Sequence, residues 1–161
     1  MRPNEVTIGD WVKHTNAKTN ECYYAKVSGI CPFIGANHNV IGWAIRFHKD
    51  GESLDSPCPT TCDPIPVTQK ILEANGFNTD GKFEICGGYT EAWILKDEEK
   101  VIKIHFFNGS FEELEIDTDK RYFSKFDNFD NLYVHELQHA FRLCGLVDLA
   151  DNFVIEKGGR Q

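Results

Sequence analysis

The sequence predicts an α+β fold with antiparallel strands in both halves of the chain. Runs of alternating apolar and polar residues indicate strands, and two further segments have the apolar spacing of helices. Glycine, asparagine and aspartate separate the alternating runs at short intervals, which favours hairpins over parallel crossover units. We expect, in chain order, an N-terminal antiparallel sheet or small barrel, a short helix, an antiparallel β-meander and a C-terminal amphipathic helix.

The first part of the chain, residues 1–63, is expected to be mainly strand. Its alternating runs are VTIGDWVKHT at residues 6–15, CYYAKVSGI at 22–30 and NVIGWAIRFH at 39–48. Three short strands separated by turn residues are typical of a curled antiparallel sheet or a small barrel. The segment that follows, KDGESLDSPCPTTCDPIP, is rich in proline and is expected to be irregular.

The second part, residues 64–161, is expected to begin with a short helix near 68–75. Thr68 suits the N-cap, and Gly76 is typical of the residue that follows a helix end. A β-meander is predicted over residues 83–116, where the sequence Asn-Gly-Ser gives the clearest hairpin signal of the chain. A last helix is predicted near 131–144, and we expect the two parts to form one compact unit.

The last predicted helix contains the pattern His-Glu-x-x-His, which forms the active site of many zinc peptidases. His135 and His139 would present two imidazoles to one metal ion, and Glu136 would deprotonate the water bound to it. Such a site also requires a third protein ligand. The candidates for that ligand are Asp148, Asp151 and Glu156.

The helical wheel favours a structural interpretation of the same segment. The apolar side chains that fall within one arc are those of Tyr133, Val134, Leu137, Ala140, Phe141 and Cys144. The opposite face, expected to lie in solvent without a metal ion, holds His135, Gln138, His139 and Arg142. Because the cation of Arg142 would oppose a bound dication, we expect a non-enzymatic protein and keep a zinc-dependent hydrolase as the alternative.

The chain has six cysteines, and we expect them in a reducing bacterial cytoplasm. Its start does not resemble a signal peptide, and it has no apolar run of membrane-spanning length. No cofactor is expected. If a metal ion is bound, we expect it at Cys58 and Cys62, with Cys22 and Cys31 completing four thiolates. The alternative is that these residues are buried free thiols, as we expect for Cys86 and Cys144.

The formal net charge is −8, and the sequence has no basic stripe. Direct binding to a nucleic-acid backbone is therefore not expected, whereas docking onto a basic protein surface is. The densest acidic segment, FEELEIDTDK, supplies the candidate binding residues Glu112, Glu113, Glu115, Asp117 and Asp119. The alternative interpretation is that these are solvated charges that deter strand-edge aggregation.

Three segments, taken together, are similar to a known family. They are EVTIGDWV at residues 5–12, PIPVTQKILEANGF at 64–77 and LYVHELQHAFRLCGL at 132–146. In this order they resemble an uncharacterised family of small proteins encoded by phages, prophages and mobile elements of Bacteroidetes. The family positions that match Glu136 and His139 also accept uncharged residues, which implies that the family does not depend on the zinc pattern.

The resemblance implies a phage or mobile-element accessory protein that acts by occupying a partner rather than by turnover. Bacteroidetes carry type VI CRISPR effectors, which target RNA and hold their guide on strongly basic surfaces. We therefore hypothesise an anti-CRISPR inhibitor that binds such a host ribonucleoprotein in the cytoplasm and does not bind membranes. The alternatives are the zinc-dependent hydrolase and an accessory factor of phage assembly.

Overall fold

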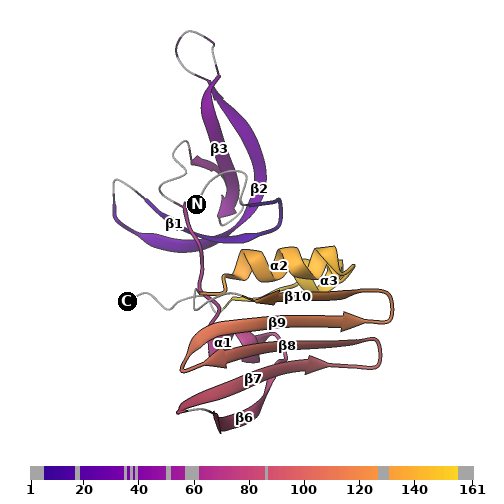
Figure 1. Cartoon of the computed structure of the whole chain (residues 1–161). Helices are drawn as coiled ribbons and strands as arrows, with labels where there is room; N and C mark the ends of the chain where they lie inside the picture. The colour runs from indigo at the N-terminus through magenta and orange to yellow at the C-terminus, as the bar shows by residue number, and fades with distance from the viewer. Residues whose placement is uncertain are drawn as a thin grey trace. The chain divides into compact units, whose positions relative to one another are not determined.

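A computed structural model of the chain describes residues 6–16, 19–34, 36, 38, 40–49, 52–56, 62–85, 87–126 and 131–155. The chain divides into two compact units, which we call unit 1 (Met1–Ile65 with Lys157–Gln161) and unit 2 (Pro66–Glu156). Both units contain an antiparallel sheet, and unit 2 also contains helices, so the fold is of the α+β class (Figure 1).

Unit 1 is built on a five-stranded sheet with the order β4-β3-β2-β1-β5. Its strands are β1 (Trp11–Thr15), β2 (Cys22–Ile34), β3 (Val40–Lys49), β4 (Glu52–Ser56) and β5 (Cys62–Asp63). The expectation that the segment after β3 is irregular is wrong for β4 and β5. Glu52–Ser56 pairs with the end of β3 and Cys62–Asp63 pairs with β1, so pairing to formed strands overrides the weak strand propensity of these residues.

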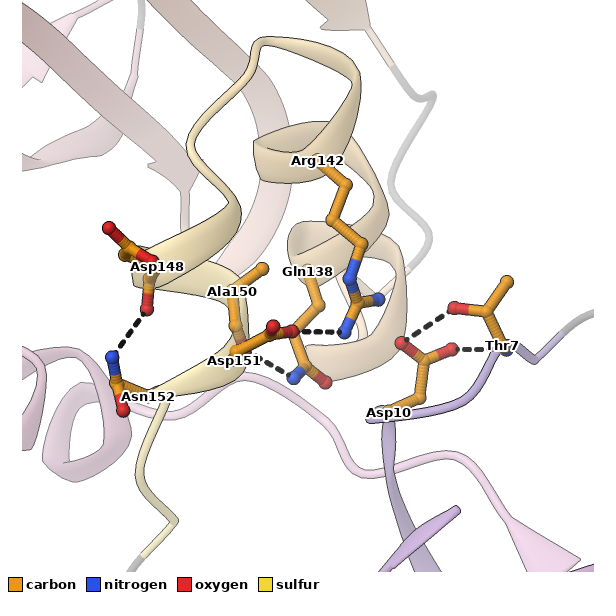
Figure 2. A network of polar contacts seen from close by, with 8 residues as sticks. All are labelled: Thr7, Asp10, Gln138, Arg142, Asp148, Ala150, Asp151 and Asn152. Atoms are coloured by element: carbon orange, nitrogen blue, oxygen red, sulfur yellow. Dashed lines mark hydrogen bonds and ion pairs between the residues drawn. The ribbon is translucent and has the colours of Figure 1, made fainter. Parts of the chain in front are cut away.

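Apolar side chains from several strands form the core of unit 1. The buried members of this core are Val6, Val12, Ala25, Val27, Ile45 and Cys62. The turn before β1 is fixed by Asp10, whose carboxylate accepts hydrogen bonds from the amide (2.7 Å) and hydroxyl (3.2 Å) of Thr7 (Figure 2). The carbonyl of Asp10 also accepts a hydrogen bond of 2.8 Å from the amide of Val27, which anchors this turn to β2.

Unit 2 begins with helix α1 (Gln69–Ala74), whose two ends have specific local causes. The hydroxyl of Thr68 accepts a hydrogen bond of 3.4 Å from the amide of Ile71, as an N-cap does. Gly76 follows the helix with φ of 82°, a conformation in which glycine has no Cβ to clash. The amide of Phe77 then donates to the carbonyl of Leu72 at 3.0 Å, which completes a Schellman motif.

The sheet of unit 2 is a five-stranded meander with the order β10-β9-β8-β7-β6. Its strands are β6 (Asn78–Ile85), β7 (Gly88–Lys96), β8 (Lys100–Phe107), β9 (Ser110–Thr118) and β10 (Tyr122–Phe126). The meander is therefore longer than the predicted range 83–116 at both ends. The additional strand β10 pairs with β9 along its whole length, which the weak alternation of the sequence YFSKF did not indicate.

The helices of unit 2 cover one face of this sheet. Alternate residues of β8 and β9 are completely buried on that face, namely Ile102, Ile104, Leu114 and Ile116. The side-chain amide of Gln69 in α1 donates to the carboxylate of Glu91 in β7 at 3.2 Å, and in Figure 1 α1 lies behind the sheet. Lys125 of β10 pairs with Glu136 of the next helix at 3.1 Å. Glu91 and Lys125 both point to the buried face of the sheet, because each is paired with a residue of the neighbouring strand whose side chain lies on that face.

Helix α2 (Val134–Leu143) is followed by a short helix α3 (Val147–Asp151), which the sequence pattern did not reveal. Leu137 and Phe141 are completely buried, as the wheel predicts. The expectation that His135 and Gln138 face solvent is wrong, because their exposed fractions are 8% and 0%. The physical reason at Gln138 is α3: the side-chain amide donates to the carbonyl of Ala150 at 2.8 Å (Figure 2).

The end of the described chain is held to α1 by Asn75. Its side-chain amide donates to the carbonyl of Val154 at 2.7 Å, and its side-chain oxygen accepts from the amide of Val154 at 2.8 Å. Phe153 is buried beside Phe141, with 6.0 Å between the ring centroids. These contacts bring the two ends of unit 2 together over one core.

We predict that Phe141→Ala lowers the free energy of unfolding by about 3–5 kcal/mol, because it leaves a cavity beneath α2. Leu143→Ala is the matched control on the same helix, since Leu143 is 61% exposed, and it should change stability by less than about 0.5 kcal/mol. Urea denaturation of both variants measures the difference. Equal losses for the two variants would contradict the assignment of the buried face.

Candidate functional site

The His-Glu-x-x-His segment lies at the start of α2, and its glutamate has structural partners. The carboxylate of Glu136 accepts a hydrogen bond of 3.1 Å from the amide of Tyr133 at the helix start, and it pairs with Lys125 at 3.1 Å. The rings of His135 and His139 lie 5.9 Å apart, edge to face. The group that would act as the base of a hydrolase is therefore engaged in capping α2 and joining it to β10.

The candidates for a third metal ligand are on or after α3. Asp151 pairs with Arg142 of α2 at 3.2 Å, and Asp148 is exposed with its carbonyl bonded by Asn152 (Figure 2). Glu156 lies outside the described residues. Among the residues that the structure describes, no group of three or more His, Cys, Asp and Glu side chains could hold a metal ion.

The described cysteines of unit 1 have separate neighbours. Cys22 is exposed, with its sulfur 3.3 Å from the hydroxyl of Thr15. The thiol of Cys31, half-buried, is directed at a carbonyl of β3, and the buried Cys62 sulfur lies 3.9 Å from Nδ1 of His14. Cys58 and Cys86 lie outside the described residues. Cys144 in unit 2 is buried, and burial raises the pKa of its thiol.

A shallow groove lies at one end of the sheet of unit 2, on the helix-covered side. Its lining residues are Gln69, Lys82, Tyr89, Glu91, Asn108 and Gly109. Glu91 is bonded by Gln69 and paired with Lys82 at 3.5 Å, and Asn108 is bonded to the backbone of Tyr89. The side chains of Gln69, Lys82, Glu91 and Asn108 are therefore engaged in contacts within the groove.

The face of the unit 2 sheet that the helices leave uncovered is the candidate binding surface, and we call it the open face. By strand register, its members on β7 to β10 include Ala92, Ile94, Val101, Lys103, His105, Glu113, Glu115, Asp117, Tyr122, Ser124 and Phe126. All of these side chains are half-buried or exposed. Because they alternate with the buried residues of the same strands, they point away from the core.

Three of the five predicted acidic residues lie on the open face, in one row along β9. These are Glu113, Glu115 and Asp117, which alternate with Leu114 and Ile116 of the core. Glu112 is exposed at a register shift between β8 and β9, and Asp119 is exposed in the turn before β10. Three of the five carboxylates therefore share one face of β9, and the other two are exposed next to this row.

The partners of this row differ from one position to the next. Glu115 pairs with Lys103 of β8 at 3.4 Å, which neutralises the centre of the row. The hydroxyl of Ser124 donates to Glu113 at 3.2 Å. Asp117 makes no side-chain hydrogen bond or ion pair with any residue in the described ranges. The two ends of the row therefore keep their negative charge available.

Two exposed aromatic rings lie beside the ends of the row, and the sequence pattern did not indicate them. Tyr122 and Phe126 of β10 are 67% and 73% exposed. Tyr122 is the direct strand partner of Asp117, and Phe126 is that of Glu113. The sequence signal was weak because YFSKF has aromatic residues at both even and odd positions. Alternation therefore does not separate the outward-facing positions of this strand from the inward-facing ones.

The negative charge of the chain is concentrated in unit 2. This unit holds 18 of the 25 Asp and Glu residues but nine of the 17 Lys and Arg residues, which gives it a formal charge of −9. Unit 1 holds the other seven acidic and eight basic residues, which gives it a formal charge of +1. An electrostatic attraction to a basic partner would therefore act on unit 2.

Comparisons with models of known protein families, with curated proteins and with solved structures found no match. The resemblance to a phage and mobile-element family therefore stays an expectation drawn from the three sequence segments quoted above. In the part of the chain that the structure describes, no helix has the length and apolar character needed to cross a membrane.

We predict that Glu136→Ala lowers the free energy of unfolding by about 0.5–2 kcal/mol, because α2 loses the acceptor for its first amide. Glu98→Ala, in the exposed turn between β7 and β8, is the control and should have little effect. Urea denaturation measures both variants, and zinc content is measured on the unmodified protein. Unchanged stability of Glu136→Ala, with one zinc ion lost on replacing both histidines, would favour the hydrolase.

Proposed function

We propose that this protein is a non-enzymatic binding module that docks the open face of unit 2 onto a basic surface of a protein or ribonucleoprotein. The observation that carries this proposal is the acidic row of β9 on an uncovered sheet face. Carboxylates that only solubilise a strand can lie anywhere on its exposed side, but these lie beside two exposed aromatic rings. Aromatic residues are enriched where proteins bind one another.

The charge of unit 2 supports docking to a basic partner in two ways. A formal charge of −9 on one unit attracts a positive surface over several ångströms and speeds the encounter. The separate carboxylates of Glu113 and Asp117 then favour one orientation, since each must meet a cation. Nucleic-acid backbones and membranes rich in anionic lipid would be repelled by the same surface.

The proposed partner is a host defence ribonucleoprotein, in particular a type VI CRISPR effector that targets RNA. The similarity to phage and mobile-element proteins supports this choice, and the basic guide-holding surface of such effectors complements the acidic row. Occupation of that surface would block guide or target access without any chemical step. The protein would then act as an inhibitor in the cytoplasm of a bacterial host.

We predict that the triple variant Glu112→Lys, Glu113→Lys, Glu115→Lys binds a guide-loaded type VI effector at least about tenfold more weakly than the unmodified protein, because like charges then face each other. The control variant Glu73→Lys, Glu98→Lys, Glu99→Lys makes the same change of net charge at exposed positions outside the row. Calorimetry at about 50 and 200 mM salt measures the affinities, because surface charges are screened more strongly at the higher concentration.

The control variant should bind with nearly unchanged affinity, and higher salt should weaken binding of the unmodified protein. Circular dichroism and urea denaturation show whether each variant is folded. Equal affinity of the folded triple variant and the unmodified protein would exclude the acidic row as the interface. Equal losses in the two variants would indicate a general charge effect rather than docking through the open face.

A further inference from the structure

The open face presents the same pair of groups twice. Asp117 lies directly opposite Tyr122, and Glu113 lies directly opposite Phe126, in the antiparallel register of β9 and β10. Side chains opposite each other in such a pair have Cβ atoms about 4.5–5.5 Å apart and stand on the same face of the sheet. In each pair a side chain that ends in a carboxylate and one that ends in an aromatic ring therefore start from neighbouring points on the same face of the sheet.

The rings of both pairs are exposed to solvent. Tyr122 and Phe126 are the most exposed large apolar side chains of β10, at 67% and 73%. Isolated exposed rings are common on protein surfaces. Two rings on one face of one strand, each beside a carboxylate, form a repeated arrangement that solvation of the strand does not require. Their shared chemistry indicates one kind of ligand group.

That ligand group is a guanidinium. Its planar fork donates two parallel hydrogen bonds to a carboxylate, and its flat face stacks on an aromatic ring. A lysine ammonium is a strongly hydrated point charge that cannot form the bidentate contact, so it would gain less from each pair. We propose that the open face recognises arginine side chains of a basic protein segment through the pairs Asp117–Tyr122 and Glu113–Phe126; this inference rests on the proposed function.

The spacing of the pairs defines the segment that fits. Asp117 and Glu113 are four residues apart on β9, which corresponds to about 13 Å along a strand. An extended segment with arginine at positions i and i+4 points both side chains to one face with the same separation. Its intermediate residue at i+2 would meet the Lys103–Glu115 ion pair, where an additional cation is disfavoured by Lys103.

Other occupants of this surface fit less well. A second copy of the chain would bring a second unit of charge −9 against the first, and like charges oppose that contact. A phosphate-bearing ligand would be repelled, because its negative charge would face the carboxylates. The extended arginine segment is the occupant whose charge, shape and spacing all match the pairs.

The test uses the full-length protein and two nine-residue peptides of serine and threonine. One peptide has arginine at positions 3 and 7, and the other has lysine at both positions. Nuclear magnetic resonance titration measures the affinity and locates the perturbed amides. We expect perturbations on β9 and β10, with the arginine peptide binding at least about fivefold more tightly, the advantage expected from two exposed stacking contacts.

The variant Tyr122→Ala, Phe126→Ala should reduce the arginine preference at least about threefold, leaving the part that the bidentate carboxylate contacts supply, while weak binding through the carboxylates persists. The control variant Phe83→Ala, Ile85→Ala removes two side chains of similar exposure, 52% and 49%, from the opposite edge strand β6, and it should keep the preference. Both variants replace exposed residues, and their amide spectra show whether the fold is retained.

The outcomes separate this inference from the proposed function. If the aromatic variant keeps the full arginine preference, or if β9 and β10 show no perturbation at millimolar peptide, the arginine pairs are not the recognition site. The proposed function would still stand if the triple charge variant loses the basic partner. If that variant binds the partner unchanged while the peptides bind as expected, the surface recognises arginine but does not dock the proposed effector.

Discussion

The burial of one face of the unit 2 sheet beneath α1 and α2 is the constraint on which the rest of unit 2 depends. Gln69 ties α1 to β7 through Glu91, and Lys125 ties β10 to α2 through Glu136. A sheet with both helices on one face has only one apolar face to bury, so its strands alternate between core and solvent. The open face, with its acidic row and its rings, follows from that arrangement.

The core beneath the helices is closed by polar side chains that bind backbone groups. Asn75 bonds both the amide and the carbonyl of Val154, and the buried amide of Gln138 bonds the carbonyl of Ala150. The buried amide of Gln138 would be costly unless it were bonded in this way, so its contact specifies the position of α3 on α2, while the exposed bonds of Asn75 hold the segment after α3 to the end of α1. The described helices of unit 2 are thereby fixed over one face of the sheet, and they leave the other face open.

Local patterns in the sequence predicted the elements whose causes are local. Thr68 and Gly76 delimit α1 through contacts within four residues, and the alternation along β8 and β9 predicted both as strands of the meander. The strands β4, β5 and β10 were missed because pairing with a neighbouring strand, rather than their own composition, determines them. The wheel failed at Gln138 because it assumes one buried face, whereas α3 covers a second side of α2.

The candidate site divides in the same way between local and long-range causes. The carboxylates of β9 could be read from the sequence, because five of them fall within eight residues. Whether they can form a binding surface depends on which of them share a face of the sheet and on which side chains lie opposite them on β10. The register between β9 and β10 determines the residues opposite. The His-Glu-x-x-His pattern shows the reverse case, since its spacing is that of a zinc site while its glutamate caps a helix. A short motif specifies the distances within one helix, but a catalytic or binding site also requires the groups that tertiary contacts place beside it.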